Sequence, residues 1–135
     1  MEKKRILFAD DDLTLGGITK LSLEHCGYEV RTVRNGQEAL RAFATSPCAF
    51  DLVILDQEMP DLKGTEVAEK LTSLRPGMPI LLYTGCQDSD LTAVAQAAGI
   101  TDIAVKSLAI EDLLHMVDKA FNFKEAPQEY SGLPI

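Results

Sequence analysis

The chain has 135 residues, of which 46% are hydrophobic and 25% charged, as in an ordinary globular domain with a full core. Its net charge of −8 argues against direct binding of nucleic acid, and its apolar runs are too short for membrane insertion. Cys26, Cys48 and Cys86 are too far apart in sequence to suggest a disulfide framework or a zinc site, and they favour a cytoplasmic location.

Short apolar runs alternate with helical patterns along the chain. The predicted strands are Ile6–Ala9, Tyr28–Val33, Asp51–Leu55, Pro79–Tyr83 and Asp102–Val105. After each strand comes a helix whose periodic apolar residues are expected to face the core: Leu15, Ile18 and Leu21; Ala39, Leu40 and Phe43; Val67, Leu71 and Leu74; Leu91, Val94, Ala95 and Ala98; Ile110, Leu113, Leu114, Val117 and Phe121. We expect one domain over residues 1–123 and a C-terminal tail over residues 124–135, which contain two prolines and a glycine.

Five strand–helix repeats predict an α/β fold, namely a doubly wound, flavodoxin-like (βα)5 domain with a five-stranded parallel sheet. The second strand alternates apolar and polar residues as an edge strand does, so the expected strand order is 2-1-3-4-5. In that order the first and third strands are neighbours where the winding reverses, which is where such sheets bind ligands.

Polar residues follow four of the predicted strands. They are Asp10 and Asp11 after the first, Asp56 after the third, Thr84 after the fourth and Lys106 after the fifth. Two carboxylates about 4 Å apart repel by roughly 4 kcal/mol at an effective dielectric constant of 20. Three of them together take up protons or hold a cation, and Mg²⁺ with its oxygen ligands suits such a site.

Asp56 is then placed to attack phosphorus and form an aspartyl phosphate. Magnesium and Lys106 would neutralise the phosphoryl oxygens, and Thr84 would donate a hydrogen bond to one of them. Each of these residues, considered alone, could instead have a purely structural role. The acids at Asp10–Asp12 suit a helix N-terminus, Lys106 suits a solvated strand end, and Thr84 suits an ordinary strand position.

Together these residues resemble the receiver domain of two-component response regulators. The resemblance runs from Arg5 to Phe121 and rests on Asp10-Asp11, Asp56, Met59-Pro60, Gly64, Thr84 and Lys106. It implies that Asp56 accepts a phosphoryl group, and that Asp11, Asp56 and the Glu58 backbone carbonyl bind Mg²⁺. Asp10 would support the ion through water. Thr84 would sense the phosphoryl group and Lys106 would pair with it.

The resemblance also implies partners. The phosphoryl donor would be a phosphohistidine on a sensor histidine kinase or a histidine phosphotransfer protein. The domain would catalyse its own phosphorylation and dephosphorylation without being a conventional turnover enzyme. The fourth helix, fifth strand and fifth helix would form the output face, which is also a candidate homodimer interface. The chain fits either a stand-alone regulator or the receiver of a hybrid sensor kinase.

Two positions depart from the family pattern. Ser107 follows the lysine where a proline, often in a cis peptide, is usual; cis before serine costs about 3–4 kcal/mol, so we expect a trans bond. Ile103 stands where Tyr or Phe usually switches orientation, and isoleucine has no polar tip to exchange between water and core. These departures leave the acceptor chemistry intact but change the expected output switch.

Two other functions compete with the receiver. Asp10-Asp11-Asp12-Leu13-Thr14 also fits a haloacid-dehalogenase-like phosphatase, with Asp10 as nucleophile and Asp12 as general acid. That enzyme would need Glu111 and Asp112 as its second acidic pair and would leave Asp56 without a role. The second competitor is a pseudo-receiver, a binding module that takes no phosphate.

Overall fold

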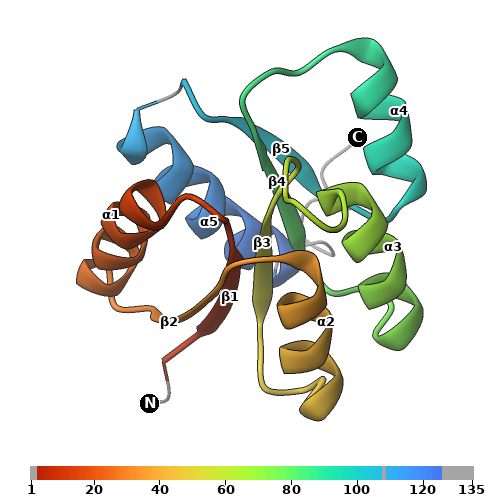
Figure 1. Cartoon of the computed structure of the whole chain (residues 1–135). Coiled ribbons are helices and arrows are strands. Elements are labelled where there is room, and N and C mark those ends of the chain that lie inside the picture. Colours follow the sequence, from red (N-terminus) through yellow and green to blue (C-terminus); the bar gives the residue numbers. More distant parts are fainter. Residues whose placement is uncertain (1–2, 108, 126–135) are drawn as a thin grey trace, which may run out of the picture.

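The computed structural model describes residues 3–107 and 109–125, in which five strands alternate with five helices (Figure 1). The strands are β1 (Arg5–Ala9), β2 (Glu29–Val33), β3 (Leu52–Asp56), β4 (Ile80–Thr84) and β5 (Asp102–Val105). The helices are α1 (Leu13–His25), α2 (Gly36–Thr45), α3 (Gly64–Leu74), α4 (Ser89–Ala97) and α5 (Ile110–Glu125). The predicted strands lie within about one residue of these bounds.

The strands form one parallel sheet in the order β2-β1-β3-β4-β5, which confirms the predicted fold and strand order. Ala9 at the end of β1 pairs with Leu55 in β3, so the residues that follow them, Asp10 and Asp56, stand side by side. On the other side of β3, Asp56 pairs with Tyr83 of β4. The register therefore brings the polar ends of β1, β3 and β4 to one edge of the sheet.

Helices cover both faces of the sheet, with α1 and α5 on one side and α2, α3 and α4 on the other (Figure 1). Each face has its own hydrophobic cluster, and the residues of β3 alternate between the two clusters. Residues 52–55 of this strand are all fully buried, each contributing about 1.5–3 kcal/mol of hydrophobic stabilisation. The strand that carries Asp56 is therefore among the most tightly packed parts of the domain.

The first two helices begin at side chains that cap their first turns. The Asp12 carboxylate accepts a hydrogen bond from the Leu15 amide at 3.0 Å, and the Asn35 side chain accepts one from the Glu38 amide at 2.8 Å. Both contacts satisfy amides that have no partner inside the helix. These caps fix where α1 and α2 start, close to the site edge of the sheet.

Part of the predicted helix packing was wrong. Ile18 and Leu21 in α1 are 54% and 68% exposed, and Leu74 in α3 and Val94 in α4 are also more than half exposed. The buried residues of α1 are instead Gly16, Thr19 and Leu23. They lie at i, i+3 and i+7 on one face of the helix, which differs from the face expected from Ile18 and Leu21.

The peptide bond between Lys106 and Ser107 is trans, as expected, and every other peptide bond in the described residues is trans as well. Helix α5 continues to Glu125, and residues 126–135, most of the predicted tail, lie outside the described residues. Among the helices of the described part of the chain, none combines the length and apolarity needed to cross a bilayer.

Candidate functional site: an acidic cluster with one lysine

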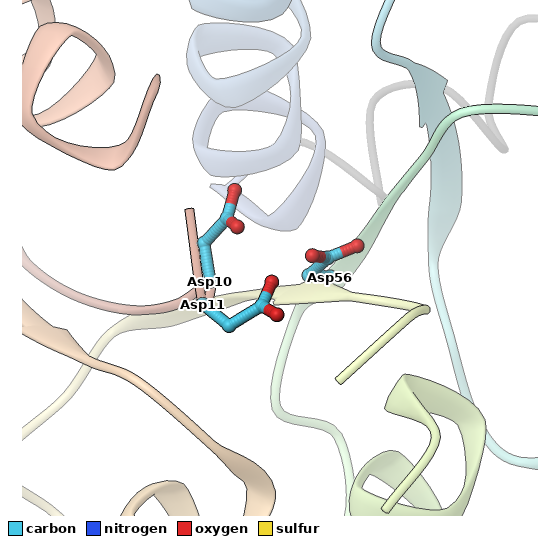
Figure 2. Close-up of side chains that lie close together, drawn as sticks. All are labelled: Asp10, Asp11 and Asp56. Carbon is cyan, nitrogen blue, oxygen red and sulfur yellow. The ribbon is translucent and has the colours of Figure 1, made fainter. Parts of the chain in front are cut away.

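Three aspartates lie together at the carboxyl ends of β1 and β3. Asp10 and Asp56 are buried, at 4% and 1% exposure, whereas Asp11 is exposed. One carboxylate oxygen from each lies within 4.8 Å of the others. Figure 2 shows the three side chains gathered at this edge, with the carboxyl group of Asp11 extending toward Asp56. We call these three residues the acidic cluster.

Lys106, directly after β5, provides the positive charge of the site. Its ammonium group lies 3.0 Å from Asp56 Oδ2 and 3.6 Å from Asp10 Oδ2. It also lies 5.6 Å from the centre of the Tyr83 ring, on whose face a cation is favoured. Burial lowers the pKa of Lys106, but the hydrogen bond to Asp56 and the charge of Asp10 outweigh burial and raise it. The lysine therefore stays protonated beside both buried carboxylates.

Asp10 is the least satisfied group of the cluster. Its Oδ1 accepts a hydrogen bond from the Asp12 amide at 2.9 Å, but its buried Oδ2 has no hydrogen-bond partner among the described residues. Burial raises the pKa of Asp10 to about 6; the Asp12 amide opposes this change, and the charge of Asp56 adds to it. Three neighbouring carboxylates, one of which has an oxygen without a hydrogen-bond partner, suit a hard divalent cation such as Mg²⁺, which prefers oxygen ligands. The residues present therefore fit the metal that the sequence suggested.

The remaining predicted site residues lie at the same edge. Glu58 is exposed, and its amide donates to Asp56 Oδ1 at 3.1 Å, which orients the carboxylate. Thr84, at 2% exposure, ends β4 one residue after the partner of Asp56. Its hydroxyl donates to the Cys86 carbonyl at 3.1 Å, so in this conformation it is engaged by the loop that follows the strand.

Sequence reasoning missed the residues that hold the loop after Asp56. The buried Gln57 side chain accepts from the Thr65 amide at 3.0 Å, and its backbone carbonyl accepts from the Gly64 amide at 3.1 Å. A Cβ at Gly64 would lie 2.5 Å from the Asp56 carbonyl oxygen, so only glycine fits there without a shift. The Met59-Pro60 and Gly64 pattern marked this turn, but nothing in it pointed to Gln57 or Thr65.

The comparison with protein families gives a match to a family described as the response regulator receiver domain, over residues 6–118. These residues include all the predicted site positions. The match therefore covers the sheet, the acidic cluster and the lysine that faces it.

Individual proteins agree with this match. The chain is 34% identical over 109 residues to the two-component response regulator ARR12 of Arabidopsis thaliana and 36% identical over 128 residues to the response regulator MprA of Mycolicibacterium vanbaalenii. These alignments cover 81% and 95% of this chain but only 18% and 54% of those proteins. A CheY-like receiver domain structure from Methanospirillum hungatei is 32% identical, with a TM-score of 0.87 over 93% of this chain and 99% of that one.

Proposed function

Because this chain belongs to the response regulator receiver domain family, whose members act in phosphorelay signalling, we propose that Asp56 is its phosphoryl acceptor. The observation that carries the proposal is the position of the Lys106 ammonium, 3.0 Å from the buried carboxylate of Asp56, which itself lies close to the carboxylates of Asp10 and Asp11. A carboxylate with a cation on one side and a cation-binding cluster on the other is arranged for the transfer of a charged group.

In the proposed reaction, a carboxylate oxygen of Asp56 attacks the phosphorus of a phosphohistidine. The new O–P bond replaces the P–N bond, whose electron pair remains on the imidazole nitrogen of the donor. The Glu58 amide holds Asp56 Oδ1 in place, and Lys106 balances the negative charge that arrives with the phosphoryl group. Rotation of the Thr84 hydroxyl from the Cys86 carbonyl would let it donate to a phosphoryl oxygen.

Asp10, Asp11, Asp56 and the backbone carbonyl of Glu58 are the groups that would hold Mg²⁺ in this proposal. When bound, the ion would supply positive charge to the phosphoryl oxygens. Asp10 would act through water, because its second oxygen already faces Lys106. Asp10 Oδ2 has no hydrogen-bond partner among the described residues, so it could accept a hydrogen bond from such a water.

A small phosphodonor tests the proposed acceptor. Incubation with acetyl phosphate and Mg²⁺ is expected to add one phosphoryl group, located on Asp56 by mass spectrometry. Asp56→Asn is expected to remain unlabelled. Asp51→Asn is a matched control, because Asp51 accepts a hydrogen bond from the Arg5 amide at the other end of β3 and should label as the wild type does. A label on Asp10, or none at all, would contradict the proposal.

The two competing functions are not favoured. In a phosphatase using Asp10 as nucleophile, Asp56 would have no role, yet it lies in the acidic cluster and pairs with Lys106. Glu111 and Asp112 are exposed in the first turn of α5 and do not belong to the metal-type cluster found among the described residues. A pseudo-receiver would not need the complete set of site residues at one edge, and calorimetry that detected no Mg²⁺ binding would support it.

Receiver domains take phosphoryl groups from histidine kinases or phosphotransfer proteins, and one of these is the proposed partner in the cytoplasm. The exposed free cysteines are compatible with a reducing compartment. The chain spans only part of the relatives named above, so both a stand-alone regulator and a hybrid kinase receiver are consistent with it. Homodimerisation through the α4–β5–α5 face remains a prediction, to be checked by sedimentation with and without phosphodonor.

A further inference from the structure

Asp61, in the loop between β3 and α3, caps a helix that lies 25 residues earlier in the chain. Its Oδ1 accepts a hydrogen bond from the Gly36 amide and its Oδ2 one from the Gln37 amide, both at 2.8 Å. These are the first two amides of α2, which have no partner within the helix. Asn35 caps the third, at Glu38. The start of α2 is therefore satisfied jointly by a local side chain and by one from the β3–α3 loop.

Close packing fixes the same contact. A Cβ at Gly36 would lie 2.8 Å from Leu62 Cβ and 3.0 Å from Val67 Cγ2, so the loop approaches α2 as closely as glycine allows. The Leu62 amide donates to Asp61 Oδ1 at 2.8 Å, and the Leu62 side chain packs against the hydrophobic core. We call this assembly of Asp61, Leu62, Gly36 and Gln37 the Asp61 clamp.

Both oxygens of the Asp61 carboxylate accept backbone hydrogen bonds. Burial alone would raise the pKa of Asp61, but hydrogen bonds from the amides of Gly36, Gln37 and Leu62 outweigh it and hold the pKa below its ordinary value. The carboxylate therefore stays ionised near neutral pH and adds favourable charge at the positive end of α2.

The clamp lies next to the site. Gln57, directly after Asp56, is bonded to Thr65 and Gly64 at the start of α3. Glu58 comes between Gln57 and Asp61 in the loop, and it is exposed. The backbone around Glu58 is thus held on one side by Gln57 and on the other by the clamp.

We propose that Asp61 is a positioning residue that fixes the β3–α3 loop and with it the backbone of Glu58, whose carbonyl is assigned to the metal site. This inference rests on the proposed function, because it assigns that carbonyl to Mg²⁺. Loss of the clamp would leave Asp10, Asp11 and Asp56 in place but free the loop to move. Mg²⁺ affinity would then fall even though none of the carboxylates at the metal site had been altered.

Two variants separate hydrogen bonding from charge. Asp61→Asn removes the charge but keeps an oxygen that can serve the Gly36 and Leu62 amides, both of which bond to Oδ1. Asp61→Ala removes the charge and every acceptor. Mg²⁺ affinity, measured by calorimetric titration with MgCl₂, is expected to weaken roughly tenfold in Asp61→Ala, in the range known for residues that support metal ligands. Asp61→Asn is expected to stay within about threefold of the wild type.

Asp88→Ala is the matched control, because Asp88 caps α4 through the Leu91 amide at 2.8 Å and lies outside the clamp. It should lower the melting temperature, as the loss of other helix caps does, while Mg²⁺ affinity stays unchanged. A second readout needs no metal: amide exchange at Gly36, Gln37 and residues 57–63 should accelerate in Asp61→Ala and remain as in the wild type in Asp88→Ala.

The outcomes distinguish the inference from the function on which it rests. Wild-type protein that does not bind Mg²⁺ would contradict the proposed metal site and with it this role of Asp61. Wild-type binding with equal weakening in the Ala and Asn variants would show a simple charge effect and overturn the inference. Wild-type binding with no weakening in Asp61→Ala would overturn it as well.

Discussion

Two carboxylates at the same edge of the sheet are used in opposite ways. Asp10 in the acidic cluster is buried, has one oxygen without a hydrogen-bond partner among the described residues, and has a pKa raised to about 6. Asp61 in the clamp is exposed, accepts three backbone hydrogen bonds, and has a lowered pKa. Asp10 therefore keeps an oxygen that can still accept a hydrogen bond or bind an ion, whereas Asp61 uses its oxygens to hold the backbone.

The contrast explains how a small domain can hold a buried carboxylate that still has an oxygen free to accept a ligand. Unsatisfied buried charge destabilises a protein, so it persists only where the surrounding structure is rigid. In this domain the rigid parts are the fully buried strand β3 and the loop after it, which Gln57 and Asp61 attach to α3 and α2. We interpret the clamp as the feature that lets the acidic cluster remain open to a ligand without the loop collapsing onto it.

The largest expected effect comes from filling the space behind Asp56. Gly64→Ala places a Cβ 2.5 Å from the Asp56 carbonyl oxygen, a backbone atom that cannot move without displacing the strand. We expect a loss of roughly 3 kcal/mol in the free energy of unfolding. Gly36→Ala places a Cβ 2.8 Å from Leu62 Cβ, an atom fixed to the loop backbone, so the loop must shift. Because this contact is longer than the one at Gly64, the cost should be lower, roughly 1–2 kcal/mol. Urea unfolding curves measure both.

Gly17→Ala is the control for these substitutions. Gly17 lies in α1, and a Cβ added there would meet no atom of the described residues within 4 Å apart from its chain neighbours and the backbone of its own helix. Alanine should therefore stabilise the helix by up to about 1 kcal/mol. If Gly64→Ala were as stable as Gly17→Ala, the loop after Asp56 would be looser than its close contacts indicate. It could then not be the rigid part that holds the acidic cluster.

Much of the site followed from sequence because parallel strands bring their carboxyl ends to one edge. The strand order alone placed Asp10 beside Asp56, and the register of Ala9 with Leu55 agrees. The trans bond at Lys106–Ser107 followed equally from general energetics. These features depend on chain topology and local chemistry, which a single sequence carries.

The Asp61 clamp and the exposed face of α1 could not be predicted from the sequence. Asp61 bonds to amides 24 and 25 residues away, and no local pattern indicates a side chain that caps a distant helix. Ile18 and Leu21 were expected in the core because apolar periodicity does not show which of two adjacent faces meets the sheet. The face that is buried carries Gly16, Thr19 and Leu23, and that choice depends on the shape of the neighbouring elements.

The next effect in size is a pH dependence with opposite signs at the two carboxylates. The folded-state pKa of Asp10 is about 6 against an ordinary 3.8, so its protonation favours folding at low pH, and this contribution is lost as pH rises through 6. Without metal, the stability of Asp10→Asn relative to the wild type should therefore rise as pH increases from about 4 to about 6 and stay constant above that, with a total gain on the order of 1–3 kcal/mol.

Asp61 should give the reverse trend. Its lowered pKa contributes stability above the ordinary value of 3.8, and this is lost as pH falls through the folded-state pKa. Asp61→Asn should thus be most destabilised near neutral pH, and the difference from wild type should narrow in acid. Unfolding curves across the pH range compare the two variants, and slopes of the same sign would contradict the contrast between the carboxylates.

The smallest expected effect is the change in stability caused by removing electrostatic repulsion within the acidic cluster. Asp11 is the exposed member, and the ion pairs of Lys106 among the described residues are with Asp10 and Asp56, so Asp11→Asn removes negative charge without breaking them. In metal-free buffer we expect a stability gain of about 0.5–1 kcal/mol, small because water screens an exposed carboxylate. The gain should disappear in saturating Mg²⁺, where wild-type protein recovers more stability from the ion than the variant does. Glu69→Gln, an exposed acid on α3, should change neither value, and a metal-free loss in Asp11→Asn would mean that the carboxylates do not repel one another.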